Sequence, residues 1–125
     1  MSKIHYFVGE DNNLKWEGVK ESNYPDEELK GITKYLLVGP EDQANNFELR
    51  LFHFEPGSRS DLVRHEKDYA FYILEGTTRL QINTEYYELK TRDVVYVSKD
   101  ELIQFVNDGI QPLRFLYVTV ASNKL

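Results

Sequence analysis

The chain has 125 residues, of which 41% are hydrophobic and 29% are charged, a composition typical of a single soluble globular domain. Its formal net charge is −6 and it has no basic cluster, so neither nucleic acid nor an anionic membrane is an expected partner. The absence of cysteine excludes disulfides, thiolate metal sites and a cysteine nucleophile.

Residues 1–30 form a polar N-terminal segment, which we expect to pack on the following domain or on a partner subunit. Residues 1–13 lack the positive and apolar regions of a signal peptide, which favours a cytoplasmic protein. Further along, Pro25 suits the first turn of a helix, the acidic residues after it favour the positive end of the helix dipole, and Gly31 would end the helix. A short N-terminal helix is therefore predicted within residues 21–31.

The rest of the chain, residues 31–125, consists of short predicted strands separated by turns. The strand segments are rich in β-branched and aromatic residues and lie between Gly, Asn, Asp or Pro signals: KYLLV, FELRLFHF, YAFYIL, RLQIN, YYEL, DVVYVS, IQFV and RFLYVTV. Their short and regular spacing predicts an all-β fold, an antiparallel sandwich or barrel. No apolar run exceeds the length of a strand, so no membrane-spanning segment is expected.

Two of these segments, FELRLFHF and RFLYVTV, are apolar on both faces. A strand of this kind in a small barrel needs cover on its outer face as well as on its inner face. Either the N-terminal segment or a second subunit could provide that cover. Of these two arrangements, we expect a homodimer.

Two stretches carry a pair of motifs, PGSRSDLVRHEKDYAFYILEG and RDVVYVSKDELIQFVND. They resemble the motifs of the cupin superfamily, G-x5-H-x-H-x3,4-E-x6-G and G-x5-P-x-G-x2-H-x3-N. Gly57 and Gly76 match the ends of the first motif, and Asn107 matches the end of the second. The preceding NFELRLFHFEPG is similar to the NFxMRLFxxxPG of small single-domain bacterial cupins. The resemblance covers roughly Gly31 to Val120 and implies an antiparallel cupin-type jelly-roll barrel.

The resemblance assigns the four metal-ligand positions of the family to Val63, His65, Tyr69 and Ile103. In the relatives these positions hold histidines, and here only His65 remains. Valine and isoleucine have no lone pairs, and a tyrosine with an ordinary pKa of about 10 is a poor ligand. Because a first-row metal needs about three good donors, we expect no metal and no other cofactor. The alternative is a divalent metal held with the help of a carboxylate such as Glu48.

Strand alternation, together with the resemblance, indicates which side chains share the barrel interior with His65. In the relatives the arginine corresponding to Arg50 points toward the metal pocket, which would put Glu48 and Phe52 on the same face. An aromatic cavity with a few polar groups is typical of a small-molecule site. The predicted ligand pocket consists of Glu48, Arg50, Phe52, His65, Tyr69, Phe71, Ile103, Phe105, Phe115 and Tyr117.

The same residues also have a purely structural interpretation. His65 can be a core histidine that is hydrogen-bonded to Tyr69 or Glu48, and the aromatic rings can simply fill the barrel. Arg50 needs a partner, because burying a lone charge is costly. It therefore pairs with Glu48 or another acid, or it binds an anionic ligand.

The residues leave three functions open. The first is a metal-free binding module for a small molecule, anionic if Arg50 binds it. The second is a metal-independent isomerase or epimerase-like enzyme, with His65 and Tyr69 as base and acid on opposite sides of the substrate. The third is a metal-dependent cupin enzyme with a rebuilt site. Whether the chain is an enzyme, and which residues would then be catalytic, is left open by the sequence.

Overall fold

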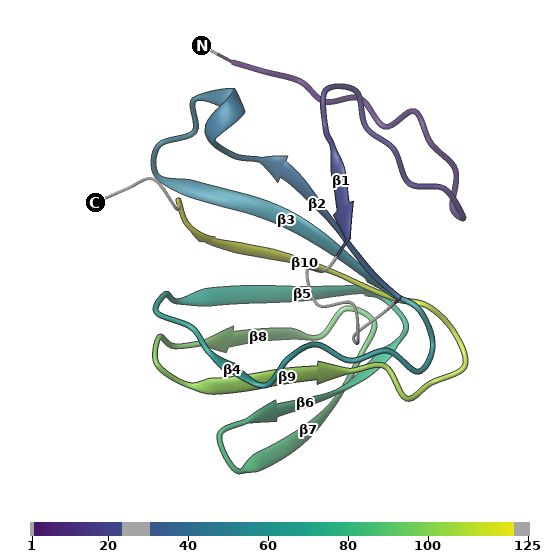
Figure 1. Ribbon diagram of the computed structural model, residues 1–125, viewed down its shortest axis with the longest axis vertical. Coiled ribbons are helices and arrows are strands. Elements are labelled where there is room, and N and C mark those ends of the chain that lie inside the picture. Colours follow the sequence, from purple (N-terminus) through teal and green to yellow (C-terminus); the bar gives the residue numbers. More distant parts are fainter. Residues whose placement is uncertain (1, 24–30, 122–125) are drawn as a thin grey trace.

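The computed structural model describes residues 2–23 and 31–121, which form two antiparallel β-sheets (Figure 1). The strands of the first sheet are, in spatial order, β1 (Glu21–Asn23), β2 (Ile32–Val38), β3 (Phe47–Phe54), β10 (Leu113–Val120), β5 (Tyr69–Glu75) and β8 (Val94–Val97). Those of the second sheet are β4 (Val63–Arg64), β9 (Leu102–Val106), β6 (Thr77–Ile82) and β7 (Glu85–Lys90). The prediction of an all-β antiparallel fold is therefore confirmed.

The described residues contain one short helical element, the 3-10 turn η1 at Pro40–Asp42. The N-terminal helix that we predicted is not supported: residues 24–30 lie outside the described residues, and Glu21–Asn23 before them form strand β1. These polar residues are extended because they pair with β2, for example Glu21 opposite Tyr35. Sheet pairing outweighs local preference here. Within the described ranges, no helix is long and apolar enough to cross a membrane.

Strand β10 lies in the middle of the larger sheet, between β3 and β5 (Figure 1). Its side chains alternate, so that Leu113, Phe115 and Tyr117 are buried while Val118 is exposed on the outer face. The buried side chains of both sheets form one core: Ile32, Phe54, Phe71, Ile73, Leu80, Val97, Ile103, Phe105, Leu113, Phe115 and Tyr117. Each large side chain buried in this way contributes about 1.5–3 kcal/mol to stability.

Two motif residues shape the turns of the barrel. Gly76, between β5 and β6, has a φ of +85°, and a Cβ there would lie 2.4 Å from the carbonyl oxygen of Pro112. Only glycine fits this position. The fully buried Asn107 donates from its side-chain nitrogen to the carbonyl oxygens of Phe54 and Gln111, at 3.0 and 2.9 Å. These residues therefore serve the fold and need no ligand to explain them.

The N-terminal residues cover one part of the outer face of the larger sheet. Phe7 packs edge-on against Trp16, and Trp16 packs against Tyr35 of β2, with ring centroids 5.2 and 5.5 Å apart. At the opposite edge of the sheet, on the same outer face, Val94 and Tyr96 of β8 are 67% and 63% exposed. The N-terminal segment thus covers the sheet near β2 and leaves β8 open. The homodimer stays a prediction.

Candidate functional site

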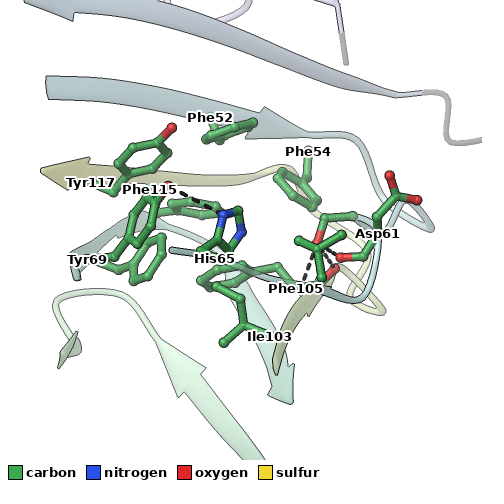
Figure 2. Close-up of a pocket in the computed structure, with 12 residues that line it drawn as sticks. Phe52, Phe54, Asp61, His65, Tyr69, Ile103, Phe105, Phe115 and Tyr117 are labelled. Atoms are coloured by element: carbon green, nitrogen blue, oxygen red, sulfur yellow. Dashed lines mark hydrogen bonds between the residues drawn. The ribbon is translucent and has the colours of Figure 1, made fainter. Parts of the chain in front are cut away.

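The core contains a cavity of about 80 Å³ that is partly open to solvent (Figure 2). Its walls come from strands β3, β4, β5, β9 and β10 and from the loops on either side of β4, the second of which carries His65. Eight of the ten predicted pocket residues line it: Phe52, His65, Tyr69, Phe71, Ile103, Phe105, Phe115 and Tyr117. The structure therefore brings these side chains together, whereas Glu48 and Arg50 lie outside the lining.

The aromatic rings form a continuous wall in which each ring packs on its neighbours. Phe115 stacks on Phe105 and on Phe52, with ring centroids 4.4 and 5.5 Å apart, and Phe52 also stacks on Tyr117 at 5.5 Å. The register of β3 and β10 places Phe52 directly opposite Phe115, which explains their contact. Such ring pairs contribute about 0.5–1.5 kcal/mol beyond the area that they bury. Much of this wall therefore stabilises the barrel whether or not a ligand binds.

His65 projects into the cavity and contacts Tyr69 (Figure 2). Its Nδ1 atom is 3.4 Å from the Tyr69 hydroxyl, and the ring centroids are 4.9 Å apart. Burial lowers the pKa of His65 and raises the pKa of Tyr69, so both side chains are neutral near pH 7. When the Tyr69 hydroxyl donates to Nδ1, the imidazole carries its proton on Nε2, where it can donate to a bound molecule.

The contact between these two residues differs from the arrangement that an acid and a base on opposite sides of a substrate would need. His65 and Tyr69 touch each other and leave no gap between them. Tyr117, also in the wall, has its pKa raised mainly by burial, which keeps its hydroxyl protonated. These three side chains thus offer neutral hydrogen-bonding groups and no charge.

Glu48 and Arg50 form an ion pair on the inner face of β3. The Glu48 Oε2 atom accepts from Nη2 of Arg50 at 2.9 Å and from its Nε at 3.2 Å. The Glu48 side chain is 2% exposed and the Arg50 side chain is 22% exposed. Of the two interpretations that we gave for Arg50, the structure shows the pair with Glu48. Its guanidinium is therefore not waiting unpaired for an anionic ligand.

The sequence analysis missed two polar residues of the cavity wall, Ser60 and Asp61. The backbone of Ser60 donates to the Phe105 carbonyl at 2.9 Å, and the Phe105 N–H donates to the Ser60 hydroxyl at 3.0 Å. These bonds hold the loop against β9 and keep Asp61 at the wall (Figure 2). The signal was present, because residues 61, 63 and 65 alternate onto one face of an extended chain.

The positions that the resemblance assigns to metal ligands do not fit a metal ion. Val63 pairs with Ile103 across β4 and β9, and both side chains line the cavity without a lone pair to offer. His65 and Asp61 supply at most two strong donors there. Throughout residues 2–23 and 31–121, no three His, Cys, Asp or Glu side chains are grouped so that they could hold a metal. A site with three good donors is needed for tight binding of a first-row metal.

Comparison with known proteins agrees with the fold. The cupin domain family model matches residues 50–119. Among solved structures, the polyketide cyclase RemF from Streptomyces resistomycificus is similar over 84% of this chain and 75% of its own, with 25% identity and a TM-score of 0.77. No curated protein sequence matches the chain.

Two further solved structures share the fold at lower identity. A cupin-2 domain protein from Rhodospirillum rubrum matches 95% of this chain and 80% of its own, with 24% identity and a TM-score of 0.79. A sugar phosphate isomerase of the cupin superfamily from Silicibacter pomeroyi matches 85% of this chain and 73% of its own, with 22% identity and a TM-score of 0.70. The relatives thus include enzymes as well as proteins described only by their fold.

Proposed function

Because this chain belongs to the cupin domain family, we propose that it uses the family's barrel as a metal-free binding module for a small, largely apolar molecule. The observation that carries the proposal is the cavity itself, which combines aromatic walls with the neutral polar groups of His65, Tyr69 and Tyr117. Sites for small molecules commonly have this composition.

The size of the cavity limits what can enter it. Its volume of about 80 Å³ is smaller than the roughly 150 Å³ of an engineered cavity that holds benzene. A short aliphatic chain or part of a ring fits inside, and the remainder of a larger ligand would extend through the opening. Inside the cavity, His65 Nε2 and the Tyr69 hydroxyl can make hydrogen bonds to a carbonyl or hydroxyl group.

The test is to fill the cavity with a larger side chain at one position of its wall. Val63→Phe adds a ring at a cavity position on the short strand β4, and Val94→Phe makes the same change at an exposed position on β8. Binding of a panel of short-chain alcohols, ketones and acids is measured by protein-observed NMR titration. We expect at least one compound to bind the wild type and Val94→Phe equally, and to bind Val63→Phe more than ten-fold more weakly. If Val63→Phe leaves every affinity unchanged, the cavity is not the site.

A second candidate function is metal-independent proton transfer to and from a bound ketone. Because His65 and Tyr69 touch each other at 3.4 Å, they would act on the ketone from the same side, unlike an acid and a base on opposite sides of a substrate. The similarity to a polyketide cyclase at 25% identity favours this candidate. A neutral histidine can take a proton and a tyrosine can return one. Exchange of deuterium into the α-carbon of a bound ketone, followed by NMR, tests this activity. Exchange that is equally fast with His65→Gln would contradict a role for the histidine.

A further inference from the structure

The sequence analysis did not place Lys34 in the pocket, but the strand register of the larger sheet places its side chain on the inner face of the barrel. Cross-strand pairs place Lys34 of β2 opposite Phe52 of β3. Side chains that face each other across two strands lie on the same side of the sheet. Phe52 lines the cavity, and Ile32, two residues before Lys34, belongs to the core. The Lys34 side chain is therefore on the inner face, where lysine is seldom found.

The same face carries the ion pair of Arg50 and Glu48. Leu36, two residues after Lys34, is opposite Arg50, and Tyr117 of β10 is opposite Arg50 on the other side. Lys34, Arg50 and Tyr117 thus occupy neighbouring positions on three adjacent strands. Adjacent strands are about 4.8 Å apart. The charged side chains of Lys34 and Arg50 therefore lie beside the end of the cavity that Tyr117 lines.

The charges in this group do not cancel. Glu48 is paired with Arg50 through its Oε2 atom, and within the described part of the chain the Lys34 ammonium makes no hydrogen bond and no ion pair. Partial burial lowers the pKa of Lys34, and the positive charge of Arg50 lowers it further. A cation that has lost water without gaining a counter-ion is stabilised by an incoming anion.

We infer that the molecule bound in the cavity carries a carboxylate or phosphate group, which binds the Lys34 ammonium beside Arg50. This inference rests on the proposed function, since the apolar part of the same molecule would occupy the aromatic cavity. Two strand spacings separate β2 from β10, so the anionic group and the apolar end lie within about 10 Å of each other. Short-chain acids and alkyl phosphates have this size and chemistry.

The experiment compares three probes that share a short alkyl chain: pentanoate, butyl phosphate and neutral 1-pentanol. Their affinities are measured by NMR titration for the wild type, for Lys34→Gln and for Lys15→Gln, which removes the same charge from an exposed position. We expect at least one anionic probe to bind the wild type and Lys15→Gln about ten-fold more tightly than pentanol. In Lys34→Gln this preference should be lost, while the affinity for pentanol is unchanged. The anionic probe that binds more tightly then distinguishes a carboxylate from a phosphate ligand.

Lys34→Met keeps the length of the side chain and provides a second variant if glutamine disturbs the fold. The inference is overturned if pentanoate and butyl phosphate bind no more tightly than pentanol. It is also overturned if both variants at Lys34 keep the full preference for the anionic probe over pentanol. Failure of the proposed function gives a different result: none of the three probes binds, or Val63→Phe binds all of them as the wild type does. If all three probes bind the wild type equally and Val63→Phe blocks their binding, the proposed function stands. The inference that the ligand carries an anionic group is then wrong.

Discussion

The buried ion pair of Glu48 and Arg50 allows a prediction about stability. Glu48→Gln keeps the shape of the side chain but removes its charge, and it leaves two cations, Arg50 and Lys34, on the inner face of the sheet. Removing one partner of a buried pair costs about 3–5 kcal/mol. Because the Arg50 side chain is 22% exposed and can recover some water, we expect the lower end, about 3 kcal/mol.

Urea unfolding measures this loss directly. With an m-value of about 1.5 kcal/mol/M, a loss of about 3 kcal/mol lowers the midpoint by about 2 M urea. Asp108→Asn is the matched control, because Asp108 and Arg79 form an ion pair at 3.7 Å with side chains 48% and 44% exposed. A surface pair of this kind contributes less than about 1 kcal/mol.

Two results would refute this reasoning. One is a midpoint for Glu48→Gln that falls no further than that of Asp108→Asn. The other comes from the double variant Glu48→Leu/Arg50→Met, which removes both charges and should be close to the wild type in stability or above it. If the double variant is as unstable as Glu48→Gln, the cost arises from lost packing and not from an uncompensated charge.

Two further predictions concern the turn at Gly76 and the cavity histidine. Gly76→Ala should destabilise the fold by about 3 kcal/mol, because the added Cβ would meet the Pro112 carbonyl. The control Gly57→Ala should cost only about 1–2 kcal/mol, because Gly57 has a φ of +86° but no atom within 4 Å of an added Cβ. Equal urea midpoints for the two variants would contradict the clash at Gly76. Burial lowers the pKa of His65 below its ordinary value, so protonation favours the unfolded chain and the stability is lost as the pH falls through about 6.5. The unfolding free energy of the wild type minus that of His65→Gln should therefore decrease between about pH 7.5 and about pH 5, and a constant difference would show that the histidine is not held neutral. The raised pKa of His5 acts in the opposite direction, but it is common to both proteins and cancels in the difference.

The sequence allowed the strands and the aromatic wall to be predicted, because period-two alternation is a local property. Phe71 and Tyr69 share a face whatever strand they pair with, and so do Phe115 and Tyr117. The same alternation extends from His65 back to Asp61, so Asp61 was also predictable from the sequence.

The inward position of Lys34 was not predictable from the sequence, for a physical reason. In the segment ITKYLLV, one alternate set contains Ile32, Lys34 and Leu36, and the other contains Tyr35. Both sets are partly apolar, so composition does not say which one faces the core. The choice depends on the register of β2 against β3, and a shift by one residue would exchange the two faces.

The predicted N-terminal helix is not supported, and only residues 21–23 at its start are described. Proline, acidic residues and a following glycine are local signals, and they describe what a short peptide prefers. Strand β1 forms because an edge of β2 is available for pairing, and that edge exists only once the sheet has assembled. For residues 21–23, pairing with β2 therefore decides the conformation.

The central position of β10 also governs how the barrel folds. Val120 pairs with Phe47, and Thr119 pairs with Tyr69, so each pairing closes a long loop of chain. The entropic cost of closing the loop arises before the strand contacts that offset it can form. Folds dominated by such distant contacts form in milliseconds to seconds, far more slowly than helical bundles. On the ribosome, β3 and β5 remain without the strand that joins them until residues 113–120 have emerged. Among the strands that the structure describes, the one synthesised last is therefore the one that joins the two halves of the main sheet.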